Sequence, residues 1–346
     1  MHMADALLSP AVGGVMWATT AGTIAWCAKK VQRDLDERKV PLMGVLGAFV
    51  FAAQMINFTI PATGSSGHLG GGLLLAILLG PYAAFLAIAS VLTVQALFFA
   101  DGGLLALGCN IFNLGVFPCF IAYPLIYRPI AGDCKNPMRI GLGATLAAVA
   151  GLQLGALGVV TETVLSGISA LPLTTFLAAM LPIHLAIGLV EGLITTTVIS
   201  FVWKARPEIL EYAAASRPLG SLAITKVLAG LGVAAVLTGG VLSWFASSSP
   251  DGLEWSMAKT SGQEELKPPQ DGIHVLLARM QEQTAVLPDY AFRVNHEGPV
   301  AAGEESAPSW PAVDKGTSTS GLVGGGLTLL LAVVVGLLCR RRSLAR

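Results

Sequence analysis

The chain has 346 residues, of which 54% are hydrophobic and only 12% are charged, and its mean hydropathy is +0.70. This composition is too apolar for an ordinary soluble domain and indicates a membrane protein with several spans. The 21 basic and 21 acidic residues balance, so no excess of positive charge points to nucleic acid as a partner.

The first ten residues, MHMADALLSP, place a histidine at position 2. The terminal amine of Met1, the backbone amide of His2 and its imidazole can therefore close fused chelate rings on a divalent metal ion. This requires that Met1 is retained with a free amine, and a bulky second residue such as His protects the initiator Met from removal. Histidine at position 2 is a weak signal by itself, so the hypothesis depends on a fourth ligand elsewhere.

The first apolar run, residues 11–28, is followed by a basic segment that contains Lys29, Lys30, Arg33, Arg38 and Lys39. A signal peptide carries its positive charge before the apolar run rather than after it. The positive-inside rule therefore places the N-terminus outside the cell and the basic loop in the cytoplasm. Small residues at i, i+4 and i+8 of this run are suited to helix docking, and we expect them to pack inside the protein: Gly14, Ala18 and Gly22.

Residues 42–60 cross back, so the next stretch, PATGSSGHLGGG, should lie outside beside the N-terminus. Irregular backbone at membrane depth is tolerated only where it is buried in protein or lines a cavity. His68 in this turn is therefore a candidate for the missing ligand. The alternative is that His68 only caps a re-entrant turn, and the pattern alone does not separate the two.

The apolar block from 70 to 100 should break at Gly80-Pro81, because a single span there would place the later basic loops outside. Its 31 residues give roughly 46 Å of helix, less than two full crossings, so we expect a shortened first helix beginning at the His68 loop. Further spans are expected at 104–127, 140–160 and 181–203, with an outer connection at 161–180.

We therefore predict an all-α fold: a polytopic membrane helical bundle of seven transmembrane helices, followed by a C-terminal two-helix unit with an extracytoplasmic loop. The predicted boundaries are a membrane domain at 1–205, a cytoplasmic linker at 206–220 and the second unit at 221–346. That unit has spans at 221–245 and 322–339. Its outer region, 247–320, is rich in Pro, Gly, Ser and Glu, so we expect much of it to be flexible.

Two histidines, an amine and a deprotonated amide offer four nitrogens. A planar four-nitrogen set suits Ni(II) or Cu(II), with Co(II) also possible. Oxygen-seeking ions such as Mg(II) are disfavoured, because the nearest carboxylates, Asp5 and Asp101, are too few for an all-oxygen cage.

Three separated motifs resemble the CbiM/NikM family: MHMADALLSP at 1–10, TGSSGHL at 63–69 and DGGLLALGCNIFN at 101–113. Its members are the substrate-binding membrane components of energy-coupling-factor transporters for cobalt and nickel. The resemblance covers about residues 1–205 and implies that the metal is held by the Met1 amine, the His2 amide and imidazole, and His68. The second unit resembles the companion component CbiN/NikN, whose motif is matched by PDGLE at 250–254.

Further polar residues lie near these motifs. Asn110 and Asn113 share a helix face, and like Ser65 and Ser66 they are candidates for orienting a ligand or its loop. Hydrogen bonding between helices is an equally good interpretation. His184 and Glu191 are seven residues apart and therefore also share a face. Because ionisable residues inside a membrane are costly, we expect them to form a structural pair or to contact a coupling subunit.

The sequence contains no GxxxxGK[ST] and no HExxH motif, so we expect a transporter subunit rather than an enzyme, without a cofactor. It would capture Ni(II) or Co(II), with nickel slightly favoured. The resemblance implies a transmembrane coupling component and cytoplasmic ATP-binding subunits as partners, in a bacterial inner membrane with the C-terminus cytoplasmic. The alternatives are a self-sufficient secondary carrier, which predicts paired broken helices in repeated halves, and an intramembrane enzyme that uses His184 and Glu191.

Overall fold

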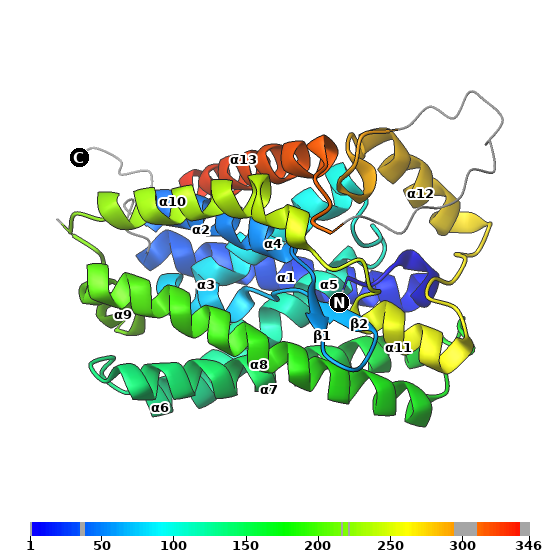
Figure 1. Cartoon of the computed structure of the whole chain (residues 1–346), viewed down its shortest axis with the longest axis horizontal. Helices are drawn as coiled ribbons and strands as arrows, with labels where there is room; N and C mark the ends of the chain where they lie inside the picture. The colour runs from blue at the N-terminus through cyan, green and yellow to red at the C-terminus, as the bar shows by residue number, and fades with distance from the viewer. Residues whose placement is uncertain (1, 35–38, 216, 221, 294–309, 340–346) are drawn as a thin grey trace.

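The structure is a computed structural model, and it describes residues 2–34, 39–215, 217–220, 222–293 and 310–339. Most of the helices lie along one long axis (Figure 1). The α-helices of the described residues are α1 (Pro10–Asp34), α2 (Lys39–Gln54), α3 (Gly72–Leu79), α4 (Pro81–Phe99), α5 (Leu107–Ile111), α6 (Arg128–Ala131), α7 (Pro137–Ser166), α8 (Leu173–Ala205), α9 (Pro207–Ala214), α10 (Thr225–Gly240), α11 (Gly252–Ser261), α12 (Gly272–Thr284) and α13 (Lys315–Leu338). A π-helical segment, η2 (Phe112–Tyr127), joins α5 to α6, and short 3-10 turns are η1 (Asp5–Leu7), η3 (Leu242–Phe245) and η4 (Pro288–Tyr290).

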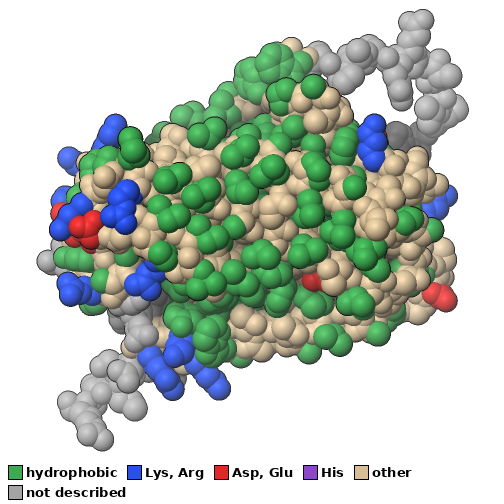
Figure 2. Space-filling view, turned by 90° about the horizontal axis from the view of Figure 1, so that it is seen from below, with side chains coloured by type: hydrophobic (Ala, Val, Ile, Leu, Met, Phe, Trp, Pro, Cys, Tyr) green, Lys and Arg blue, Asp and Glu red, His purple; other side chains and the backbone are tan. Residues whose placement is uncertain are grey.

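Among the described residues, five helical stretches are long and apolar enough to cross a membrane: Pro81–Phe99, Leu107–Ala131, Pro137–Ser166, Leu173–Ala205 and Lys315–Leu338. Two further apolar helices, α2 and α10, have 16 residues each. The chain is thus a multi-pass membrane protein, and the count of seven spans in its first domain stays a prediction. Figure 2 shows apolar side chains spread along the bundle, with most of the visible Lys and Arg side chains at the end where α6 and α9 lie.

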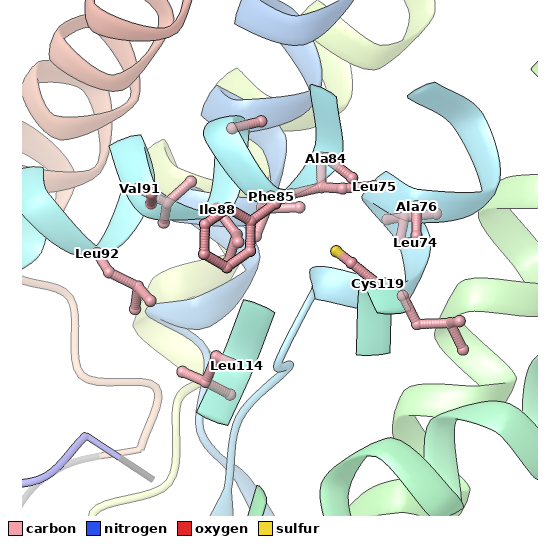
Figure 3. Packing of buried hydrophobic residues seen from close by; sticks show 14 of the residues in the cluster. Leu74, Leu75, Ala76, Ala84, Phe85, Ile88, Val91, Leu92, Leu114 and Cys119 are labelled. Atoms are coloured by element: carbon pink, nitrogen blue, oxygen red, sulfur yellow. The ribbon is translucent and has the colours of Figure 1, made fainter. Parts of the chain in front are cut away.

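The apolar block at 70–100 breaks where the charge pattern predicts. Gly80 separates α3 from α4 with φ +82, a conformation that favours glycine. Pro81 is the first residue of α4, where the backbone N–H that proline lacks would have no partner within the helix. All eight residues of α3 are buried, and they rise only about 12 Å. Figure 3 shows the apolar core around this short helix, with Leu75 of α3 beside Phe85 of α4.

Three predictions about segments need correction. The outer connection expected at 161–180 is shorter, because α7 continues to Ser166 and α8 begins at Leu173. The loop after α2 forms an antiparallel hairpin, β1 (Phe58–Ile60) with β2 (Ser65–Gly67), which pairs backbone groups that would otherwise be buried without partners. The small residues of α1 face outward, since a Cβ at Gly14 or Gly22 would meet nothing within 4 Å. Charge parity fixes the side on which a loop lies but not where each helix ends.

The outer region of the second unit is more ordered than its composition predicts. Its α11 begins with a capping box: Asp251 Oδ1 accepts from the Leu253 and Glu254 N–H groups at 2.7 and 2.9 Å, and Glu254 accepts from the Asp251 N–H. Residues 294–309 lie outside the described residues. The predicted linker also contains a helix, α9, whose Ile209, Leu210 and Ala213 are buried.

The two units pack directly on one another, with α10 and α13 against α2 and with α13 also against α4 (Figure 1). Glycines allow the close approach: a Cβ at Gly321 of α13 would lie 2.3 Å from the Gly239 carbonyl oxygen of α10, and one at Gly324 would meet the Phe51 ring of α2 at 2.0 Å. The second unit also reaches the hairpin that leads to His68, because α11 contacts β2.

Candidate metal site

The N-terminal segment folds back into the bundle and is held there by its backbone. Met3 is fully buried; its N–H donates to Asn110 Oδ1 at 2.8 Å, and its carbonyl accepts from Asn110 Nδ2 at 3.2 Å and from the Gly103 N–H at 3.0 Å. Asp5 Oδ1 accepts from the Ala106 N–H at 2.9 Å. Asn110, a predicted supporting residue, thus satisfies both backbone groups of the residue that follows His2.

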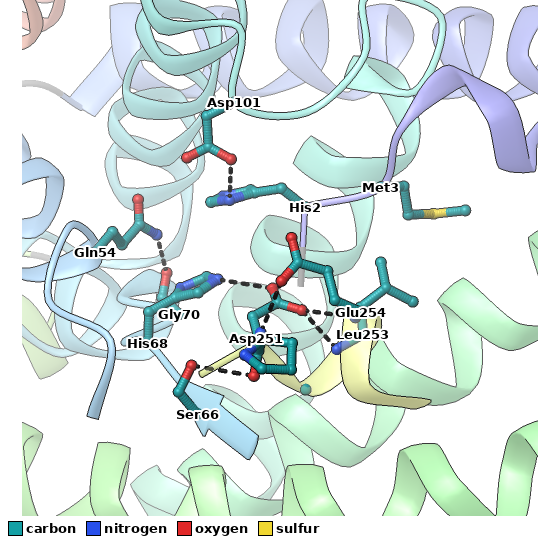
Figure 4. Close-up of polar contacts among 12 residues, drawn as sticks. His2, Met3, Gln54, Ser66, His68, Gly70, Asp101, Asp251, Leu253 and Glu254 are labelled. Atoms are coloured by element: carbon teal, nitrogen blue, oxygen red, sulfur yellow. Dashed lines mark hydrogen bonds and ion pairs between the residues drawn. The ribbon is translucent and has the colours of Figure 1, made fainter. Parts of the chain in front are cut away.

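The two predicted histidine ligands lie together (Figure 4). The rings of His2 and His68 are stacked, with centroids 4.9 Å apart and planes 12° apart, and each side chain is 8% exposed. Met1 lies outside the described residues, so its amine stays a predicted ligand. Because the lone pairs of stacked rings lie in nearly parallel planes, one ring must turn before both can bind one ion in a planar arrangement.

Each histidine has one ring nitrogen fixed by a hydrogen bond. His68 Nδ1 donates to the Leu69 carbonyl at 3.1 Å, which leaves Nε2 as the nitrogen with a lone pair. Burial lowers the pKa of His68 to about 3, so the ring is neutral at neutral pH, as a metal ligand must be. His2 Nδ1 faces Asp101 Oδ1 at 2.9 Å. A chelate that includes the His2 amide uses the same nitrogen, because Nδ1 closes a six-membered ring with that amide and the ion. Metal binding in that mode therefore requires the His2 ring to turn over.

Asp101 anchors His2, a role that the sequence does not predict. Its second oxygen accepts from the Tyr290 hydroxyl of the second unit at 2.5 Å. Burial opposes ionisation, but the His2 imidazole and the hydrogen bonds from His2 and Tyr290 hold the pKa of Asp101 well below its usual range. The motif at 101–113 contains Asp101 but does not reveal this contact.

The PDGLE motif also enters the site. Asp251 Oδ2 lies 3.8 Å from His68 Nε2 (Figure 4). The predicted serines help to place it: the Ser66 N–H and Oγ donate to the carbonyls of Pro250 and Ser249 at 2.8 and 2.7 Å. Ser65 Oγ donates to the Ser66 carbonyl at 3.1 Å. These hydroxyls therefore bond to backbone and dock the second unit onto the turn that carries His68.

The remaining candidates have other partners. Asn113 Nδ2 donates to Glu162 Oε2 at 2.8 Å, which is the expected alternative of bonding between helices. His184 Nδ1 donates to the Met180 carbonyl at 2.8 Å. Glu191 accepts from the N–H groups of Gly70 and Gly71. The described hydrogen bonds of His184 and Glu191 thus have different partners and do not join the two residues as a pair.

A cavity of about 500 Å³ opens above the histidines, between the two units. Among the described residues, its lining contains no Lys or Arg. It contains six carboxylates, which belong to Asp5, Asp101, Asp251, Glu254, Glu265 and Asp289. Within the described part of the chain, no group of three or more His, Cys, Asp or Glu residues is arranged to hold a metal ion. The predicted site differs from such a group, because it takes its other two nitrogens from the Met1 amine and the His2 amide.

Residues 2–209 match the family profile of CbiM, the cobalt uptake substrate-specific transmembrane region. The chain belongs to the CbiM family. Residues 225–341 match a second profile, the PDGLE domain, so the CbiM region is followed in the same chain by a CbiN-like domain. Both parts of the resemblance predicted from the sequence motifs are confirmed.

This CbiM-family chain is similar to named transport proteins. It is 36% identical over 233 residues to a putative fused nickel transport protein NikMN of Archaeoglobus fulgidus, covering 66% of this chain and 74% of that protein. It is 32% identical over 319 residues to the fused nickel transport protein NikMN of Rhodobacter capsulatus, covering 84% and 88%. A crystal structure of a transition metal transporter matches with a TM-score of 0.53 and 34% identity over 61% of this chain and 96% of that one. The chain is thus a membrane component of cobalt or nickel uptake.

Proposed function

We propose that this chain is the metal-capturing membrane subunit of an ATP-driven energy-coupling-factor importer for Ni(II) or Co(II). The observation that carries the proposal is the stacking of His2 on His68, with ring centroids 4.9 Å apart inside a buried site. The ion would be bound by the Met1 amine, the His2 amide and imidazole, and His68. A planar four-nitrogen set favours nickel modestly over cobalt.

The carboxylate-lined cavity supports capture of a cation from the outer side. Six carboxylates without a basic residue among the described lining attract divalent cations and raise their local concentration. The outer region of the second unit forms part of this wall, so we propose that it helps to insert or release the ion. The basic end of the bundle would face the cytoplasm, and this cavity and the N-terminus would then lie outside.

Energy for transport would come from partner proteins. The sequence contains no GxxxxGK[ST] motif, so we propose cytoplasmic ATP-binding subunits and a transmembrane coupling component. A contact surface for the coupling component is available on α1, where Gly14, Ala18 and Gly22 are exposed along one face. Uptake into vesicles only when the partner subunits are present would support this scheme, and uptake by the chain alone would favour the secondary carrier.

The ligand set is tested by Ni(II) binding to the purified chain with its native N-terminus, compared with a version that carries four extra glycines before Met1. The extension moves the amine away from His2 and should weaken Ni(II) binding about 100-fold, or roughly 2.7 kcal/mol. The same four glycines added after the last residue are the matched control and should leave binding unchanged. Equal affinity of the two N-terminal forms would rule out the Met1 amine as a ligand.

A further inference from the structure

The backbone that follows His68 is held by side chains from two helices. Glu191 of α8 accepts from the Gly70 N–H at Oε2, at 2.9 Å, and from the Gly71 N–H at Oε1, at 3.1 Å. Gln54 of α2 donates from Nε2 to the Gly70 carbonyl, also at 2.9 Å. Three hydrogen bonds thus converge on two consecutive residues, beginning two positions after the proposed metal ligand.

Close packing and backbone conformation require glycine at both positions of this turn. A Cβ at Gly70 would lie 2.8 Å from Glu191 Oε2, and one at Gly71 would lie 2.4 Å from Val50. Gly71 also has φ +79, a conformation that other residues rarely adopt. The sequence Gly70-Gly71 therefore lets the carboxylate reach the backbone directly, and the turn has little freedom to shift.

The Glu191 carboxylate is costly to bury. The side chain is only 2% exposed, and none of the ion pairs among the described residues involves it. An unpaired buried carboxylate adds less to stability than an apolar side chain of the same size would. Its hydrogen bonds to the turn therefore indicate a role in fixing the geometry of that turn rather than in stabilising the bundle.

We propose that Glu191 is a positioning residue for His68: by holding the Gly70 and Gly71 N–H groups, it fixes the exit of the turn and keeps the imidazole directed at the ion. The inference rests on the proposed function, because it takes His68 as a ligand. A glutamine at this position would offer one oxygen and one NH2 group, so that a donor would face one of the two backbone N–H groups. His68 would then be displaced while the rest of α8 is unchanged.

The test compares Glu191→Gln with wild type in the full-length purified chain, using Ni(II) as the probe. Affinity should fall about 10- to 100-fold, as is typical when a group supporting a ligand is lost. The d–d absorption band of bound Ni(II) should also move to longer wavelength, because a water oxygen replaces the His68 nitrogen. This shift reports the ligand set, which a merely structural loss would leave unchanged.

Gln153→Leu is the matched control. Gln153 of α7 donates from Nε2 to the Leu181 carbonyl at 2.8 Å, so it contacts α8, the helix that carries Glu191, but not the His68 turn. This variant should keep the wild-type band and affinity. A Glu191→Gln band at the wild-type wavelength would overturn the inference if His68→Ala shifts that band. If His68→Ala left the band unchanged as well, the proposed ligand set would fail instead.

A second variant keeps the inference testable if Glu191→Gln does not fold, as judged by gel filtration. Gln54→Leu removes the hold on the Gly70 carbonyl from the opposite side and leaves the carboxylate in place. It should shift the Ni(II) band in the same direction. An unchanged band in a folded Gln54→Leu protein would show that the hydrogen bonds to Gly70 do not set the position of His68.

Discussion

Oδ2 of Asp251 lies 3.8 Å from Nε2 of His68, so a carboxylate of the PDGLE motif faces the nitrogen that we propose to bind the metal. The other oxygen of Asp251 caps α11 by accepting hydrogen bonds from two backbone N–H groups in the first turn of that helix. The side chain is therefore fixed by the helix that it starts. An ion bound to His68 would lie within reach of this carboxylate, which joins the second unit to the metal site.

Asp251→Asn removes the negative charge and keeps a residue that caps helices well. We expect the fold to survive and Ni(II) affinity to fall about ten-fold, or roughly 1.4 kcal/mol, because a charge beside the ion is lost. Isothermal titration calorimetry measures the change. Asp271→Asn, at an exposed position before α12, is the control and should bind like wild type. Equal affinity of the two variants would remove Asp251 from the site.

His68→Ala tests the histidine itself. It should weaken Ni(II) binding about 100-fold, or roughly 2.7 kcal/mol, because one of four proposed nitrogen ligands is lost. The bundle should remain folded, since the β1–β2 pairing and the Glu191 contacts of the turn are retained. Equilibrium dialysis gives both affinity and stoichiometry. His184→Ala, which removes another buried histidine, should retain both, and a loss equal to that of His68→Ala would place the site elsewhere.

Local patterns in the sequence predict the first unit better than its contacts with the second. The break at Gly80-Pro81 follows from charge parity and from a glycine-proline pair, and the His68 turn follows from its glycines. The spacing of His184 and Glu191 shows that they share a helix face, but it does not show what lies opposite. The approach of Asp251 to His68 depends on how two distant segments pack, so no local pattern encodes it.

The two asparagines should give different defects, although they lie three residues apart. Asn110→Ala removes the hydrogen bonds that hold Met3, so it should lower Ni(II) affinity about ten-fold through the loosened N-terminus. Asn113→Ala leaves the Glu162 carboxylate without its amide and should cost about 1–3 kcal/mol of stability with little change in affinity. Thermal unfolding and Ni(II) titration of both variants separate the effects. A shared loss of affinity would contradict this division.

Helix α12 closes the cavity through backbone carbonyls of the first unit. His274 Nε2 donates to Leu8 at 2.9 Å, and Gln281 Nε2 donates to Ala96 and Gly102 at 2.9 and 2.7 Å. The double variant His274→Ala/Gln281→Ala loses three hydrogen bonds worth about 0.5–1.5 kcal/mol each. Helix α12 should therefore move away from the cavity more often, and Ni(II) should dissociate at least about ten-fold faster. Stopped-flow transfer to a chelator measures the rate. Arg279→Ala, on the exposed face of α12, is the control; a double variant with the wild-type rate would show that α12 does not limit release.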